Sequence, residues 1–276
     1  SYISLILASL FTLVSTFLFK NINILLLFYF LAFICLYISL KKSKNTILFF
    51  YFNSGIIVLY IWIASMYYIS NHIYFQNGKS DDFKYEKYAY NLSNISSYND
   101  LIFYSDSHES VRISKHHNSL GYINFVTIFY KVFKYPFGYS SILPRIFNVF
   151  ISSCIGYLIY IYLNSQIIPS FQSKLAGLIF IIMPSVSFVS SHIFRDIIIT
   201  FLIFILFYIN INSKFGYAKK GFYLLLTISI IIYSYQYRQF TAFTLTFLLL
   251  SIYFFSINNK FLRYFYYTLS LILFSY

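Results

Sequence analysis

Residues 46–70 read TILFFYFNSGIIVLYIWIASMYYIS, a run without a single charged side chain. An α-helix rises about 1.5 Å per residue, so a run of this length can cross a hydrocarbon core about 30 Å thick. In lipid such a run must be helical, because an open strand would leave its N–H and C=O groups without hydrogen bonds. The stretch therefore predicts a transmembrane helix.

Comparable apolar runs recur along the whole chain of 276 residues, and the composition fits them. Hydrophobic residues make up 59% of the chain and charged residues 10%, whereas a soluble domain has about 25% charged residues. The sequence therefore predicts an all-α, polytopic membrane helix bundle with about nine spans. Besides 46–70, the predicted spans are 3–19, 22–40, 146–163, 175–191, 197–212, 221–236, 240–257 and 262–276.

These spans divide the chain into three parts. Residues 1–70 hold three transmembrane helices, residues 71–145 form a long external loop with amphipathic and interfacial helices, and residues 146–276 hold six further spans. The chain starts at Ser1 and stops inside an apolar run, so we expect it to be part of a longer protein. Cys35 and Cys154 fall inside predicted spans, which favours buried structural thiols over a disulfide framework or a metal site.

The positions of the basic residues predict which side each loop faces, since short cytoplasmic loops are rich in Lys and Arg. Lys41, Lys42 and Lys44 should be cytoplasmic, which places residues 71–145 outside. Residues 119–133 are apolar but short, and we interpret them as an interfacial helix. With this choice the inner side holds Lys41, Lys42, Lys44, Lys174, Lys214, Lys219, Lys220, Lys260 and Arg263, and all seven acids fall outside.

This distribution also bears on partners. The net charge of +13 comes in part from the cytoplasmic lysines, which suit an anionic lipid bilayer. No basic patch is interleaved with a nucleic-acid recognition element, so the sequence predicts no nucleic-acid partner.

An acidic pair, Asp81 and Asp82, opens the polar segment after the third predicted span. Apolar residues then recur about three and four apart up to Leu92, which predicts an amphipathic helix. Two readings remain open for the pair. Ser80 or Asp81 could cap this helix beside a solvated neighbour, or one carboxylate could act as a general base near the membrane surface.

A second constellation, His192, Arg195 and Asp196, lies between two predicted spans. If this stretch is helical, His192 and Asp196 share a face. Arg238 lies between two further spans. Interfacial ion pairs and snorkelling would explain these residues, yet ionisable groups at membrane depth are functional-site hypotheses by default.

The histidines of the long loop are candidate metal ligands by residue type. His108, His116 and His117 lie near Asp106 and Glu109, but no recognised ligand spacing is present, and a solvated loop explains them better. We therefore predict no metal site and no cofactor.

Several of these features together resemble membrane enzymes of cell-surface glycan assembly. The chain is similar to C-type glycosyltransferases that use polyprenyl-phosphate sugars, and to multi-spanning O-antigen or capsule repeat-unit polymerases. The likeness rests on the acid pair followed by Tyr85, on the interfacial helix 119–133, and on the stretch 138–148 with Pro144 and Arg145. Pro184 and Arg195–Asp196 add to it. The chain has two more spans before the acidic loop than the C-type pattern, which has one, and this resembles polymerases more.

The resemblance implies a reaction and a location. It implies glycosyl transfer from a polyprenyl-linked sugar or oligosaccharide at the outer face of a bacterial inner (plasma) membrane. Asp81 is then the first choice for the general base and Asp82 the second. Arg195, Arg238 and His192 would hold the lipid phosphate, and Asp196 would orient Arg195.

Two other classes of protein fit parts of the pattern. A lipid-linked oligosaccharide flippase also has many spans and arginine-lined cavities, but such transporters usually show internal repeats and charges deep within spans. A structural subunit of a membrane complex would need no reaction at its outer acids. The gathering of charged groups on one face favours the enzyme.

Overall fold

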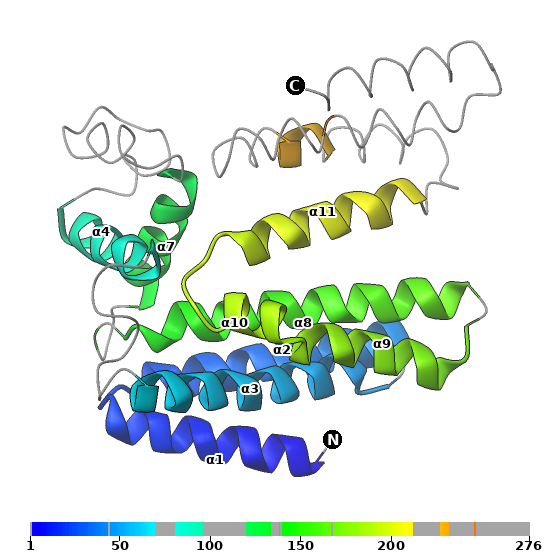
Figure 1. Cartoon of the computed structure of the whole chain (residues 1–276), viewed down its shortest axis with the longest axis horizontal. Coiled ribbons are helices and arrows are strands. Elements are labelled where there is room, and N and C mark those ends of the chain that lie inside the picture. The colour runs from blue at the N-terminus through cyan, green and yellow to red at the C-terminus, as the bar shows by residue number, and fades with distance from the viewer. Residues whose placement is uncertain are drawn as a thin grey trace. The chain divides into compact units, whose positions relative to one another are not determined.

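The computed structural model describes residues 2–43, 45–69, 81–95, 120–133, 138, 140–166, 168–211, 227–231 and 246 (Figure 1). All the secondary structure in these ranges is helical. The chain forms two compact units, residues 1–205 and residues 206–276. In the second unit the described residues are the end of one helix, residues 206–211, together with 227–231 and 246.

The helices that the structure describes follow the predicted order. They are α1 (Tyr2–Leu18), α2 (Asn23–Ser43), α3 (Ile47–Ile69), α4 (Asp81–Ile95), α7 (Leu120–Phe133), α8 (Ile142–Ser165), α9 (Ser170–Ile182), α10 (Pro184–Ser190) and α11 (Asp196–Ile211).

Three of these helices, α2, α3 and α8, are long and apolar enough to cross a membrane. A fourth span is present if α9 and α10, which meet at a bend of 58°, are one interrupted span. Helix α1 and the first part of α11 are apolar but shorter. The protein is therefore a helical, multi-pass membrane protein with three to four candidate spans among the described residues.

The sequence placed most of the described helices well. Helices α1, α2, α3 and α11 coincide with predicted spans, and the helices expected after Asp81 and over 119–133 are confirmed as α4 and α7. The predicted span 175–191 is broken at Met183, because Pro184 has no N–H to continue the helix. The predicted spans 221–236, 240–257 and 262–276 lie outside the described residues, apart from 227–231 and 246.

Helix α3 lies at the centre of the first unit and packs against α1, α2, α8 and α9. Glycines allow the closest of these contacts. A Cβ atom on Gly177 of α9 would lie 2.5 Å from the carbonyl oxygen of Gly156 on α8 and 2.5 Å from the Tyr51 hydroxyl of α3. Small residues at helix crossings are the usual way in which membrane helices approach one another closely.

Helix α1 shows an inside-out pattern of polarity. Its buried side chains are small or polar, namely Ala8, Thr12 and Ser15. Its large apolar side chains are exposed, and Tyr2 and Phe17 are among the most exposed, at 82% and 74%. A helix in water would bury the large apolar groups instead. This pattern fits a helix whose outer face meets lipid.

The chain runs back and forth through the first unit, so its turns gather at two ends (Figure 1). We call one the arginine end: it holds the turn 19–22, residues 138 and 140–141, and the turn 191–195. The Asn21 amide donates to the Gly138 carbonyl at 3.0 Å there. We call the other the lysine end: it holds residues 43, 45–46, 166 and 168–169. The Asn45 amide donates to the Tyr160 hydroxyl at 3.2 Å there.

Candidate functional site

The candidate site is built on the first turns of α8, at the arginine end. The Ser140 hydroxyl accepts the Ile142 N–H at 3.4 Å and so satisfies a donor at the helix start. Pro144 lies in the first turn, where a missing N–H costs no hydrogen bond. Arg145 follows, and its side chain is completely buried.

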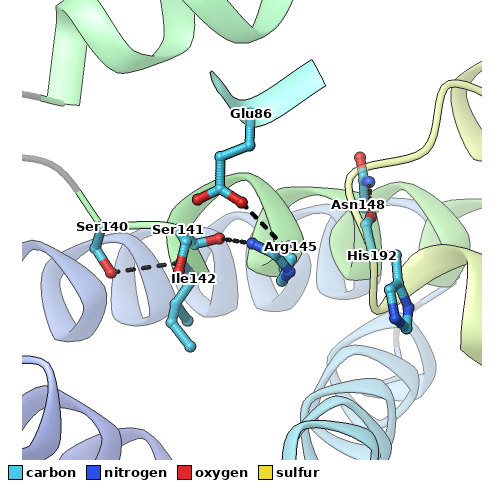
Figure 2. Close-up of polar contacts among 7 residues, drawn as sticks. All are labelled: Glu86, Ser140, Ser141, Ile142, Arg145, Asn148 and His192. Atoms are coloured by element: carbon cyan, nitrogen blue, oxygen red, sulfur yellow. Dashed lines mark hydrogen bonds and ion pairs between the residues drawn. The ribbon is translucent and has the colours of Figure 1, made fainter. Parts of the chain in front are cut away.

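Within the part of the chain that the structure describes, Ser141 and Glu86 each provide an oxygen atom that contacts Arg145 (Figure 2). One terminal nitrogen, Nη1, donates to the Ser141 carbonyl of the preceding turn. The other, Nη2, lies 3.5 Å from Oε2 of Glu86, whose side chain is 16% exposed. Burying a guanidinium is costly unless a carboxylate compensates its charge. Glu86 therefore explains why an arginine can lie inside α8 at this depth.

Glu86 comes from α4, a helix that packs against α7. The Tyr85 ring meets the Tyr122 ring edge-on, with centroids 5.4 Å apart. Helix α7 in turn contacts α8, since Phe125 lies 5.6 Å from Phe147 between ring centroids. The Asn23 amide of α2 donates to the Phe133 carbonyl at 2.9 Å. The α4–α7 pair is thus attached to the bundle through several contacts, of which the Arg145–Glu86 pair is ionic.

Asn148 lies one turn after Arg145 on α8 and is also buried. Its amide nitrogen donates to the main-chain carbonyl of His192 at 2.7 Å (Figure 2). This bond ties α8 to the turn between α10 and α11. The same end of one helix therefore holds both α4 and the turn 191–195.

His192 is buried, with 2% of its surface exposed. Its Nδ1 atom lies 2.7 Å from the Phe188 carbonyl. Its ring packs against Phe188 and Phe194, with centroid distances of 4.2 and 5.6 Å. The imidazole is therefore buried beside two aromatic rings, an environment that favours packing.

Arg195 and Asp196 lie beside this buried turn. Residues 191–195 interrupt the helix, so His192 and Asp196 do not share a helical face, unlike the helical reading of the sequence. The Arg195 carbonyl accepts the N–H groups of Ile198 and Ile199 at the start of α11. The Arg195 side chain is half-buried and Asp196 is exposed in the first turn of α11, where a carboxylate stabilises the helix dipole.

The remaining predicted site residues are placed in part. Asp81 and Asp82 are the first two residues of α4, and their side chains lie outside the described part of the structure. Arg238 lies outside the described residues altogether. The structure thus brings His192, Arg195 and Asp196 into one turn, and it joins the helix that starts at the acid pair to the same end of α8.

Sequence reasoning missed three residues of this arrangement: Arg145, Glu86 and Asn148. Arg145 and Asn148 were part of the stretch that carries the family resemblance, but no role was predicted for them. An arginine next to an apolar run was a signal, because its insertion at a helix centre would cost about 2.5–3.5 kcal/mol without a partner. Which of the acids would supply that partner could not be read from the sequence.

The described residues hold no cluster of three or more His, Cys, Asp or Glu side chains that could bind a metal ion.

No protein-family model matches the chain. No curated protein and no solved structure matches it significantly.

Proposed function

We propose that this protein transfers a glycosyl group from a polyprenyl-phosphate or polyprenyl-diphosphate donor to a glycan acceptor, as in cell-surface polysaccharide assembly. The observation that supports this most is the meeting of two candidate segments at one end of α8. Glu86 of α4, five residues after the acid pair, contacts Arg145, while Asn148 binds the turn that carries Arg195.

The chemistry of such a transfer suits these residues. A lipid phosphate is a good leaving group, so the main need is a carboxylate that takes the proton of the acceptor hydroxyl. Asp81 is our first choice for that base, and Asp82 the second. A cation must also stabilise the negative charge that builds on the departing phosphate.

The burial of the arginines helps to assign that cation. Among the described residues Arg145 is enclosed and paired with Glu86, whereas Arg195 is partly exposed. An arginine at a surface can bind a phosphate with two parallel N–H···O bonds. We therefore assign the lipid phosphate to Arg195, with Arg238 as a second contact and Asp196 orienting Arg195. The buried His192 fits this role less well.

The proposal includes a topology and a location. The full chain would cross a bacterial plasma membrane about nine times, with the arginine end outside and α7 along the interface. The distribution of charge supports this orientation, because Lys41, Lys42 and Lys174 belong to helices near their lysine ends.

The test is neutralisation of the acid pair in purified, membrane-reconstituted protein. Asp81→Asn with Asp82→Asn should lower glycan elongation about 100-fold or more, because general-base catalysis contributes at least that factor. The matched control is Asp100→Asn, the same change at another acid of the external segment, which should retain activity. Full activity in the double variant would overturn the base assignment.

A flippase for lipid-linked oligosaccharides is the second candidate, and one observation favours it. The 58° bend between α9 and α10 interrupts a span, and discontinuous helices are common at transporter substrate sites. Gene deletion separates the two functions. Single repeat units on the cell surface indicate a lost polymerase, whereas lipid-linked units retained inside the cell indicate a lost flippase.

A further inference from the structure

A buried ion pair between α8 and α4 has no place in the reaction chemistry proposed above. Arg145 is 0% exposed, and its Nη2 atom lies 3.5 Å from Glu86 Oε2. The two residues are 59 positions apart in the chain, and they connect a transmembrane helix to a helix of the external segment.

Such a pair is a costly way to attach one helix to another. Replacing a buried ion pair by apolar residues of similar volume is often neutral or stabilising, so packing alone does not require it. What an ion pair adds is a preferred geometry, because the planar guanidinium donates its N–H groups to a carboxylate only in a narrow set of directions. The Nη2–Oε2 contact therefore restrains α4 relative to α8.

The position of α4 matters because of what lies at its start. Asp81 and Asp82 precede Glu86 on the same helix by about one and a half turns. A shift or rotation of α4 would carry both acids with it. Helix α4 also packs against α7, where the Tyr85 ring meets the Tyr122 ring edge-on. The Arg145–Glu86 pair adds an ionic contact between α4 and α8.

We propose that Arg145 and Glu86 are positioning residues, which together hold the acid pair of α4 at a fixed place over the arginine end. The inference that this placement serves catalysis rests on the proposed glycosyl transfer. The placement itself is a structural statement that can be tested without any activity assay.

The direct test measures the distance between α4 and the bundle. Cys35 and Cys154 are replaced by Ala, and spin labels are attached at Ile22, in the turn before α2, and at Tyr90 on α4. Both sites are exposed, at 41% and 44%. In lipid nanodiscs, pulsed electron–electron double resonance should give one narrow distribution of the distance between the two spin labels in the parent protein. Glu86→Gln should broaden or shift it.

Matched variants separate the ion pair from general damage. Lys87→Gln removes a charge from the exposed neighbour of Glu86 and should leave the distribution narrow. Arg145→Lys keeps the charge but loses the planar guanidinium, and should give an intermediate width. Glu86→Gln leaves the buried guanidinium of Arg145 without its counter-charge. The double variant Arg145→Met with Glu86→Gln removes both charges, leaves neither unpaired, and should show the same broadening.

Activity then tests the consequence of the placement. If the parent protein is active, Glu86→Gln should lower the rate of glycan elongation about tenfold or more, because the base is misplaced. Lys87→Gln should lower this rate less than about twofold, as is usual for an exposed residue away from such contacts. An unchanged distance distribution in Glu86→Gln would overturn the proposal, whatever the activity. A broadened distribution in a protein whose parent shows no glycan elongation would support the positioning pair and overturn the proposed function.

Discussion

At the arginine end a fully buried guanidinium meets a carboxylate from a distant helix, and a buried amide holds the main chain of a turn. At the lysine end Lys41 and Lys174 lie exposed. Lys41 stands 5.6 Å from the centre of the Tyr37 ring of its own helix. The two ends therefore differ in their basic residues. At the arginine end a buried arginine makes a tertiary ion pair, whereas at the lysine end Lys41 and Lys174 lie exposed.

This contrast between buried and exposed basic residues indicates where in the molecule a functional site is expected. Exposed cations in short loops need no partner, because headgroups and water solvate them, and their main consequence is orientation. A buried ionisable group must be compensated, so it persists where structure or function needs it. Three variants at the arginine end, each with a counterpart at the lysine end, test this comparison.

Arg145→Met should have the largest effect. It leaves Glu86 facing an apolar side chain and removes the donor to the Ser141 carbonyl. Breaking a buried pair costs about 3–5 kcal/mol, and the partial exposure of Glu86 points to the lower value. The free energy of unfolding, measured by denaturant titration in mixed micelles, should fall by about 3 kcal/mol.

The counterpart of this variant is Lys174→Met, at the exposed lysine of α9 near the other end. An exposed substitution of this kind should change the free energy of unfolding by less than about 0.5 kcal/mol. Equal losses in the two variants would contradict the distinction between the ends.

Asn148→Ala should have the next largest effect. It leaves the buried His192 carbonyl without the 2.7 Å bond from the Asn148 amide. An unsatisfied buried acceptor costs about 1–3 kcal/mol. Hydrogen exchange of the main-chain amides in 190–196 should accelerate as the turn loosens. Asn164→Ala, at the exposed far end of the same helix, should leave that exchange unchanged.

Asn45→Ala should have a smaller effect than Arg145→Met. Asn45 bonds to the Tyr160 hydroxyl and accepts the Ile47 N–H at 3.1 Å at the start of α3. Loss of such a cap costs about 1 kcal/mol in the free energy of unfolding.

Asn21 has the same role before α2, but it is buried and its amide also bonds to the Gly138 carbonyl. Asn21→Ala should therefore cost more than about 1 kcal/mol, since it removes a buried cap and one of two bonds to the Gly138 carbonyl, which also accepts from the Asn23 amide at 3.3 Å. A larger loss at Asn45 than at Asn21 would reverse the comparison between the ends.

The sequence predicted the helices well where a local signal exists. The apolar run 46–70 gave α3, and the spacing after Asp81 gave α4. The errors have physical causes. The predicted span 146–163 began after Arg145 because a charge was taken as a boundary, yet α8 starts at Ile142 since Glu86 compensates that charge.

The candidate site was harder to predict. The sequence singled out His192, Arg195 and Asp196 by their unusual place between spans, and the structure keeps them in one turn. It separates their environments, however, because His192 is buried beside the aromatic rings of Phe188 and Phe194 while Asp196 is exposed. Exposure depends on neighbours far along the chain, so spacing along one segment could not give it.

The amino-acid sequence alone was enough to give the class of this protein and the positions of most of its described helices. These properties follow from the transfer free energy of contiguous residues and need no knowledge of packing. The tertiary structure decided that Arg145 pairs with Glu86, that Asn148 holds the turn at His192, and that Gly156 lies against Gly177. Each of these contacts joins residues that are distant in the chain, and each exists because helix packing removes water from groups that must then satisfy one another.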